Sequence, residues 1–324
     1  MAIMLEQLRV RRGMSVLEIG AGTGYNVALL AELVGPNGSV VSIDIQADVA
    51  AHARRTLKRE GYPDVRIVRG DGARGLRSAA PFDRIVATAA CWQIPRDWVR
   101  QLEGGGVLVL PLRLNLAHVG VAFRKQGEDL VSFSATPCGF MPLQGGAGRR
   151  RGRRLGGPQS PIYLSSDYRG PRLHAAALAA LLRTPPRRVL MEGLKQIARL
   201  PRSSDFSRFL SLQGMPLVGI GVVSDAVYDW GIADTSQGSL CLLSPQDVQR
   251  GEAIVYGAPF AADALQAQLA RWRAAGRPGV EQLRMRVEPS AFSLLGEMPH
   301  PMPDGTYQFR RRGMKFTVWY EAGA

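Results

Sequence analysis

Short apolar runs alternate with helix-like spacing of apolar residues along the first half of the chain. Ser15–Ile19 (SVLEI) is a strand-like run, and Val27–Val34 then places apolar residues at helical spacing. Ser39–Ile43 and the pattern Ala50–Leu57 repeat this order. Further strand-like runs are Val65–Arg69, Arg84–Thr88, Gly106–Leu110, Ala117–Phe123 and Leu130–Ser134. The alternation predicts an α/β fold with a parallel sheet wound by helices, followed by two antiparallel strands.

The pattern changes after Leu143, and the chain's length favours two domains over one. We predict a first domain over residues 1–144, a Gly/Arg-rich linker over residues 145–160, and a C-terminal α+β extension over residues 161–324. In the extension, helices are expected at Leu173–Leu182 and Ala261–Ala275. Strands are expected at Leu217–Val223, Ser239–Leu243 and Met314–Tyr320.

The formal net charge of +14 raises the question of a polyanionic partner. Only four of the 41 basic residues are lysines, so the bias is also explained by a GC-rich genome, and it would equally suit an acidic peptide or protein. An NPPY-like tetrapeptide for holding a flipped base is absent, which disfavours nucleic acid as the substrate. The linker arginines fit either an acidic partner or a solvated segment: Arg149, Arg150, Arg151, Arg153 and Arg154.

The cysteines, the histidines and the lengths of the apolar runs give further expectations. Cys91, Cys138 and Cys241 are widely spaced and are expected to be buried thiols. The four histidines lack metal-ligand spacing, so no metal is expected. There is no apolar run of membrane-spanning length and no signal-peptide pattern, which predicts no membrane partner and a cytoplasmic location.

The candidate chemistry begins in the EIGAGTGY turn, which starts at Glu18. Gly20, Gly22 and Gly24 let the backbone turn sharply between strand and helix and approach a ligand at the carboxyl edge of the sheet. A turn without a ligand and a dinucleotide site are the alternatives. The last glycine of GxGxxG is missing, because Asn26 follows the tyrosine. An adenosyl group without phosphates therefore fits better than a pyrophosphate.

Two aspartates end the second and third predicted strands at the same edge. Asp44 follows the glycine turn by some twenty residues, where its carboxylate can accept hydrogen bonds from both ribose hydroxyls; its alternative role is a helix N-cap. Asp71, followed by Gly72, can accept a bond from an adenine amino group, or can simply form a turn. The glycines and the two aspartates together are far more specific than any of them alone.

Four motifs in this order resemble the protein-L-isoaspartate O-methyltransferase family. They are VLEIGAGTGYNVALLAEL, GDGARGL, APFDRIVATAACWQIP and QLEGGGVLVLPL, and the resemblance spans about Met1 to Leu143, closing with GFMPL. It implies a Rossmann-like class I methyltransferase with a seven-stranded, mostly parallel sheet and an antiparallel last strand. It also implies S-adenosyl-L-methionine as cofactor and a peptide or protein carboxylate, of isoaspartate or aspartate, as methyl acceptor.

On this resemblance we expect cofactor contacts at Glu18, Gly20, Gly22, Thr23, Gly24, Asp44, Ile45, Asp71 and Gly72. Thr88, at the end of the fourth predicted strand, is the candidate acceptor-side residue, with a bond to local backbone as the alternative. Trp92 is expected in the core. The family carries a further segment, with an acceptor-contacting loop, before the helix that MAIMLEQL resembles. Three explanations are open: the start codon lies upstream, the chain is shortened, or its C-terminal half supplies that surface.

Three functions follow. The first is carboxyl methylation of isoaspartyl residues in proteins. The second is methylation of aspartate in one precursor peptide, which the C-terminal extension and the weakly similar run Gly276–Gly279 (GRPG) suggest. The third is a non-catalytic, cofactor-binding partner protein. A carboxylate acceptor is already ionised at neutral pH, so sparse acid and base residues are consistent with either enzyme.

Overall fold

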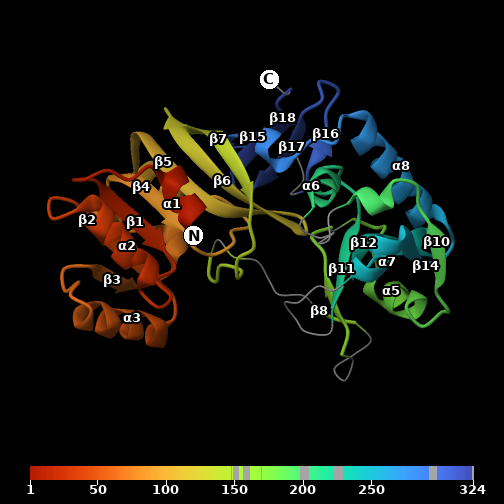
Figure 1. Cartoon of the computed structure of the whole chain (residues 1–324), viewed down its shortest axis with the longest axis horizontal. Coiled ribbons are helices and arrows are strands. Elements are labelled where there is room, and N and C mark those ends of the chain that lie inside the picture. The colour runs from red at the N-terminus through yellow and green to blue at the C-terminus, as the bar shows by residue number, and fades with distance from the viewer. Residues whose placement is uncertain are drawn as a thin grey trace.

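The computed structural model describes residues 1–146, 148, 153–155, 161–168, 170–197, 204–221, 229–291 and 298–322. Two sheets dominate this part of the chain, and they lie on opposite sides of the view in Figure 1. The C-terminal strands lie between them at the top of that view, beside the N-terminal half. The chain therefore folds back so that its last strands join the sheet that its first strands begin.

Five parallel strands form one end of the first sheet, in the order β5-β4-β1-β2-β3, with β3 at the edge. They are β1 (Ser15–Ile19), β2 (Ser39–Asp44), β3 (Arg66–Arg69), β4 (Phe82–Ala87) and β5 (Leu102–Leu114). Their centres match the predicted runs, with β5 much longer than expected because pairing extends through its glycines and beyond Leu110. The predicted parallel sheet is confirmed.

Alternating side chains of these strands pack into two separate cores. Val16 of β1 packs with the helices α1 (Ala2–Leu8), α2 (Tyr25–Val34) and α3 (Ala47–Arg59). Its neighbour Leu17 packs on the opposite face, with α4 (Arg96–Gln101) and the 3-10 turns η1 (Gly72–Arg74) and η2 (Arg77–Ala79) near it. Helices thus cover both faces, as an α/β fold of this class requires.

The first sheet is larger than the resemblance implied. After β6 (Ala117–Gln126) and β7 (Asp129–Pro137), both antiparallel as predicted, it continues through strands from the C-terminus. These are β15 (Leu283–Pro289), β16 (His300–Pro301), β17 (Tyr307–Arg311) and β18 (Met314–Tyr320), which bring the sheet to eleven strands in the described residues. The expected seven strands are therefore an underestimate.

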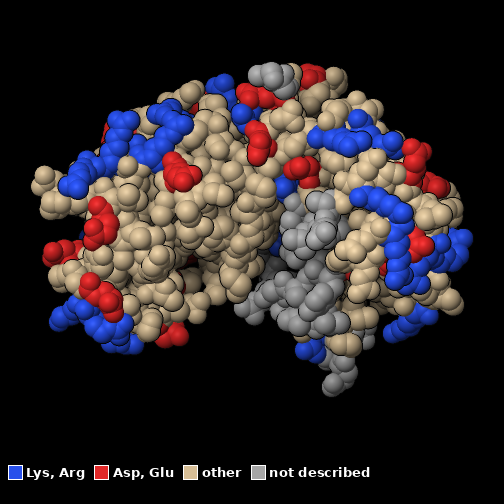
Figure 2. Space-filling model, viewed as in Figure 1, with Lys and Arg blue, Asp and Glu red and all other residues tan. Residues whose placement is uncertain are grey.

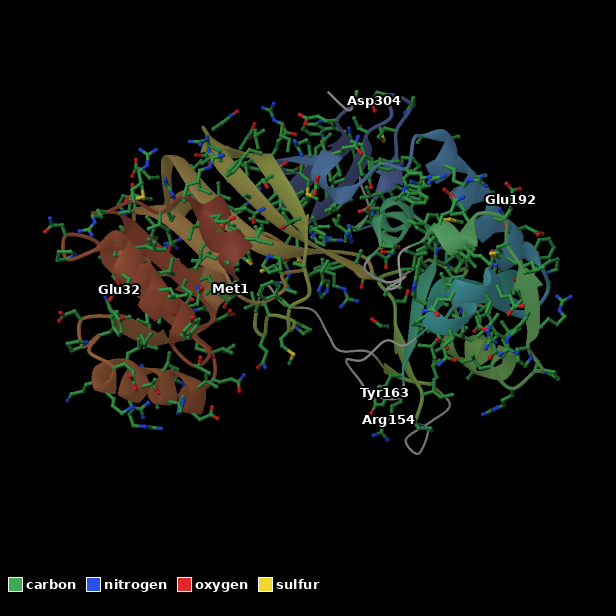
Figure 3. The ribbon with its side chains drawn as sticks, viewed as in Figure 1. Met1, Glu32, Arg154, Tyr163, Glu192 and Asp304 are labelled. Carbon is green, nitrogen blue, oxygen red and sulfur yellow. The ribbon has the colours of Figure 1, made fainter. Side chains whose placement is uncertain are left out.

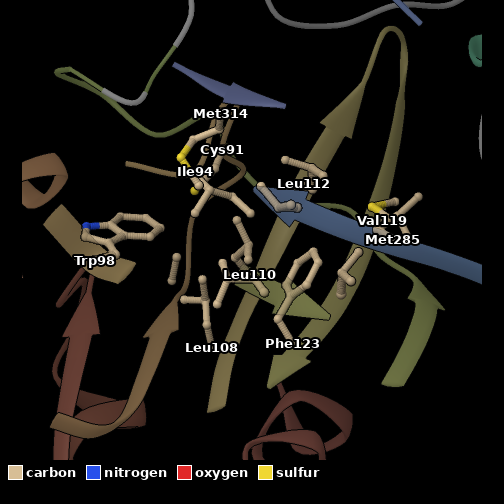
Figure 4. Close-up of a cluster of buried hydrophobic side chains, with 14 of the residues drawn as sticks. Cys91, Ile94, Trp98, Leu108, Leu110, Leu112, Val119, Phe123, Met285 and Met314 are labelled. Atoms are coloured by element: carbon tan, nitrogen blue, oxygen red, sulfur yellow. The ribbon is translucent and has the colours of Figure 1, made fainter. Parts of the chain in front are cut away.

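The added strands complete the core of the first sheet. Figure 4 shows Met285 of β15 beside Val119 and Phe123, and Met314 of β18 beside Cys91 and Ile94. Both methionines are fully buried. Burying a side chain of this size contributes roughly 1.5–3 kcal/mol. The C-terminal strands therefore stabilise the half of the chain that carries the candidate site.

The second sheet is antiparallel throughout, in the order β10-β14-β13-β12-β11-β9-β8. Its strands are β8 (Arg153–Arg154), β9 (Tyr163–Ser165), β10 (Arg187–Leu190), β11 (Leu217–Gly221), β12 (Asp229–Asp234), β13 (Ser239–Leu243) and β14 (Glu252–Gly257). Its helices are α5 (Ala175–Leu181), α6 (Asp205–Ser211), α7 (Pro245–Arg250) and α8 (Phe260–Ala274), with short turns η3 (Leu194–Gln196) and η5 (Thr235–Gln237). A further turn, η6 (Val280–Gln282), packs against β7 of the first sheet. Buried apolar residues of α8 and of strands β12–β14 share one core.

The predicted C-terminal elements lie at or near their observed positions, and the additional β-rich part agrees with an α+β extension. Residues 222 and 223 of one predicted strand lie outside the described residues. The C-terminal residues contribute to both sheets, and the division of the chain at residues 144 and 160 stays a prediction.

The surface charge can be followed in the figures. In Figure 2, basic and acidic side chains are interspersed over the visible face, with basic residues gathered most closely over its upper left part. Of the linker arginines, Arg154 is described with its side chain: its Nε donates to the hydroxyl of Tyr163 at 2.7 Å (Figure 3). Arg149, Arg150 and Arg151 lie outside the described residues. In the described part of the chain, none of the helices has the length and apolar character needed to span a membrane.

Candidate functional site

The glycine turn joins β1 to α2 at the carboxyl edge of the sheet. Gly20 has φ 104°, Gly22 has φ 52° and Gly24, the N-cap of α2, has φ 89°. A side chain disfavours this region of backbone conformation. A Cβ on Gly20 would also lie 2.5 Å from the Thr88 hydroxyl. Glycine is therefore required here on two grounds, and the exposed Gly22 and Thr23 leave the turn accessible.

Glu18 lies in β1, directly before this turn, and is fully buried. Its carboxylate accepts hydrogen bonds from the Asn26 side chain at 2.7 Å and from the hydroxyl of Ser42, its neighbour in register on β2. Burial raises the pKa of Glu18 to about 7, although both hydrogen bonds lower it. A buried carboxyl with this pKa is a candidate functional group.

Asp44 ends β2 and reaches the glycine turn. Its Oδ2 accepts from the Gly22 amide at 3.3 Å, and its Oδ1 accepts from the Gln46 amide at 3.0 Å. Gln46, and not Asp44, is the N-cap residue of α3. The aspartate is half-buried and Ile45 follows it at the same edge. The structure thus brings Asp44 and the glycine turn together, as the proposed ribose contact requires.

Asp71 caps the 3-10 turn η1, since its Oδ1 accepts from the Ala73 amide at 3.0 Å. The next residue, Gly72, lies so close to β1 that an added Cβ would be 2.4 Å from Ile19 Cγ2. The second carboxylate oxygen of Asp71 accepts from the Gly146 amide at 2.9 Å. Asp71 therefore forms a turn, as its alternative role predicts. It also binds the backbone at Gly146, later in the chain.

Thr88 follows β4 and faces the glycine turn from the other side. Its hydroxyl lies 2.7 Å from the Gly20 carbonyl oxygen and 3.1 Å from that of Ile19. This is the local backbone contact considered as its alternative role, and a contact with the acceptor stays a prediction. Trp92, in the loop that follows, is buried. Cys91 and Cys241 are also buried, Cys138 is half-buried, and all three are free thiols.

Comparison with known proteins decides the family. A protein-family model described as Protein-L-isoaspartate(D-aspartate) O-methyltransferase (PCMT) matches residues 1–148. The protein-L-isoaspartate O-methyltransferase of Ignicoccus hospitalis is 41% identical over 143 residues, which cover 44% of this chain and 68% of that protein. This chain belongs to the protein-L-isoaspartate O-methyltransferase family.

Other members of the family give the same picture. The enzyme of Hyperthermus butylicus is 41% identical over 158 residues, which cover 46% of this chain and 66% of that protein. The chain thus spans about two thirds of the length of these relatives. A solved protein-L-isoaspartate O-methyltransferase aligns with 88% of this chain and 76% of its own at 24% identity and a TM-score of 0.47, too low a similarity to support an inference. The family match ends at residue 148, so the second sheet and the C-terminal strands lie outside it.

The sequence analysis does not predict two contacts at the candidate site of this family member. The first is the pairing of Glu18 with Ser42, for which the sequence did hold a signal: both are polar residues inside apolar strands. The second is the segment at Gly145 and Gly146, which was assigned to a linker but lies against Asp71. Its partners include Arg312, which is distant in sequence, and no local pattern indicates that contact. Among the described residues no cluster of His, Cys, Asp or Glu could hold a metal ion.

Proposed function

We propose that this chain is an S-adenosylmethionine-dependent methyltransferase that esterifies the carboxylate of isoaspartyl residues in peptides and proteins. The observation that carries the proposal is the convergence of the glycine turn, Asp44 and Asp71 at one edge of the sheet, in a chain of this family. Names of relatives describe activity on isoaspartate and do not favour the precursor-peptide or non-catalytic alternatives. The proposal includes the cytoplasmic location expected from the sequence.

The site fits the cofactor in shape and in polarity. Gly20, Gly22 and Gly24 carry no side chain, and a Cβ on Gly22 would meet only open space, so the backbone of the turn can lie against a ligand. Asp44 would accept hydrogen bonds from the ribose hydroxyls, and Asp71 from the adenine amino group, with Ile45 and Gly72 beside them. Asp71 keeps lone pairs for this after its bonds to Ala73 and Gly146. Glu18 lies below the turn, where its ionised form would favour a cationic ligand.

The residues of this chain have little covalent chemistry to perform. When bound, S-adenosylmethionine would supply an electrophilic methyl group: an oxygen of the acceptor carboxylate bonds to the methyl carbon while the bond from that carbon to the sulfonium sulfur breaks. The acceptor is ionised at neutral pH, so the protein needs no general base. Its contribution is alignment of the two groups and exclusion of water, and Thr88 is placed to fix the turn that provides this alignment.

Transfer of a labelled methyl group to matched peptides tests this function. One peptide carries a single L-isoaspartate and the other carries L-aspartate at the same position. We expect base-labile label on the isoaspartyl peptide alone. Cofactor binding without transfer to any peptide would support the binding-protein alternative, and transfer to the aspartyl peptide alone would support the dedicated-peptide alternative.

A further inference from the structure

The turn between β17 and β18 reaches the candidate site from the far end of the chain. Arg312 and Gly313 form this turn, both with positive φ, at 41° and 80°. The guanidinium of Arg96, on α4, donates to the carbonyl oxygen of Gly313 and to that of Ser290, each at 2.9 Å. These hydrogen bonds fix the turn to α4, the helix between β4 and β5.

Arg311 is buried at the base of the turn, with 1% of its surface exposed. Its Nη1 donates to the carbonyl oxygens of Trp92 at 2.6 Å and Arg113 at 2.7 Å. The guanidinium carbon lies 3.4 Å from the centroid of the Trp92 ring, a stacked cation–π contact. One arginine of the C-terminal hairpin thus fixes the loop after β4 through both its backbone and its indole.

Arg312 makes the second contact of the turn with the candidate site. Its Nη1 donates to the Gly146 carbonyl oxygen at 2.8 Å, and the buried Gln93 donates to the same oxygen at 2.7 Å. The Gly146 amide in turn donates to Asp71. At Gly145, an added Cβ would lie 2.6 Å from Asp71 Oδ1 and 3.0 Å from Ile45 Cδ1. The peptide held by Arg312 and Gln93 therefore lies against two predicted cofactor contacts, Asp71 and Ile45.

We propose that the hairpin turn is a positioning element of the methyltransferase site, with Arg312 holding Gly146 against Asp71 and Arg311 holding the loop at Trp92. This inference rests on the proposed function, and it assigns a role to residues outside the family match. Arg312 holds the segment at Gly146 against Asp71 in the absence of ligand. Because this segment is already ordered, ligand binding costs less conformational entropy. The C-terminal strands thus contribute to cofactor affinity as well as to the core.

Binding of S-adenosylhomocysteine to the full chain, measured by calorimetry, tests the role of Arg312. Arg312→Ala removes a charge-assisted hydrogen bond at an exposed position, so we expect an unchanged melting temperature and a dissociation constant raised about three- to tenfold. Arg312→Lys keeps a cationic donor and should recover part of this loss. Arg271→Ala, an equal loss of charge on the exposed side of α8, is the matched control and should leave the affinity unchanged.

Amide hydrogen exchange without ligand separates this inference from the proposed function. In Arg312→Ala, a fragment containing Gly146 should exchange faster than in the unchanged chain, and in Arg311→Lys a fragment containing Trp92 should do the same. Unchanged exchange in both variants, or equal or tighter ligand binding by Arg312→Ala, would overturn the inference. Faster exchange in a chain that binds no S-adenosylhomocysteine would retain the positioning role and reject the proposed cofactor.

Discussion

The two sheets both bury acidic side chains, but they compensate the charge differently. Around the second sheet, the buried Asp247 of α7 and the buried Asp234 of β12 each pair with an arginine: Arg188 at 3.1 Å and Arg172 at 2.7 Å. In the first sheet Glu18 is fully buried, and its hydrogen bonds come from the uncharged Asn26 and Ser42.

The pKa shifts follow from these partners. Burial raises the pKa of Asp247, but hydrogen bonds from Ser244 and Arg188 outweigh it, and the net shift is downward. Burial raises the pKa of Glu18 to about 7, since no such compensation is strong enough there. The two aspartates near the second sheet are paired with arginine, whereas the buried carboxyl below the glycine turn has only uncharged hydrogen-bond partners.

Strand direction explains why the polar edge belongs to the first sheet. Strands β1 to β5 are parallel, so their carboxyl ends meet at one edge, where Gly20, Asp44 and Thr88 lie. In the second sheet, neighbouring strands are antiparallel, so their carboxyl ends alternate between its two opposite edges. There, Asp247 accepts a hydrogen bond from Ser244 at the start of α7 and pairs with Arg188 of β10.

The largest expected effect tests whether the C-terminal strands belong with the first sheet. Met285→Ala empties a fully buried position between β15 and the core of Figure 4, so the free energy of unfolding should fall by about 2–5 kcal/mol. Denaturant unfolding measures it. Arg286→Ala, an exposed change on the same strand, is the control and should have a much smaller effect. A near-neutral Met285→Ala would show that these strands are dispensable.

The pH dependence of stability tests the uncompensated charge of Glu18. Its folded-state pKa of about 7 exceeds the ordinary value of 4.5, so the folded state retains a proton that the unfolded chain releases. Stability should therefore fall as pH rises from 4.5 through 7, by up to about 3 kcal/mol. Glu18→Gln cannot titrate, and the difference in melting temperature between the two proteins should shift in favour of the variant over this window. A constant difference would contradict the raised pKa.

Cofactor affinity tests the assignment of Asp44. Asp44→Ala removes the acceptor of two ribose hydrogen bonds, and we expect binding of S-adenosylhomocysteine to weaken about 10- to 100-fold. Asp48→Ala, in the exposed first turn of α3, is the nearby control. Equal affinity in the two variants would reject the ribose contact.

Loss of an acidic side chain near the second sheet should lower stability without changing cofactor affinity. Asp247→Ala removes the carboxylate that accepts from the Ser244 hydroxyl and from Arg188, and should lower the free energy of unfolding by about 0.5–2 kcal/mol, while cofactor affinity stays unchanged. Thermal unfolding and calorimetric binding on the same sample measure both. A loss of affinity comparable to that of Asp44→Ala would remove the contrast between the sheets.

Much of the fold and site could be predicted because the signals are local. Periodicity located β1 to β7, and strand order placed Asp44 and Asp71 at the edge that holds the glycine turn. The pairing of β15 with β7 depends on contacts between residues more than 150 positions apart, as in the bond from the Met285 amide to Ser132. The role of Gly146 could not be predicted for the same reason, because its partners Asp71 and Arg312 lie 75 positions before it and 166 positions after it.

The most direct test of the central claim is a crystal structure of the full chain with S-adenosylhomocysteine. We predict the ribose hydroxyls within hydrogen-bonding distance of Asp44, the adenine beside Asp71 and Ile45, and the ligand backbone along the glycine turn. Ligand bound elsewhere, or Asp44 and Asp71 both without ligand contact in crystals soaked to saturation, would contradict the account.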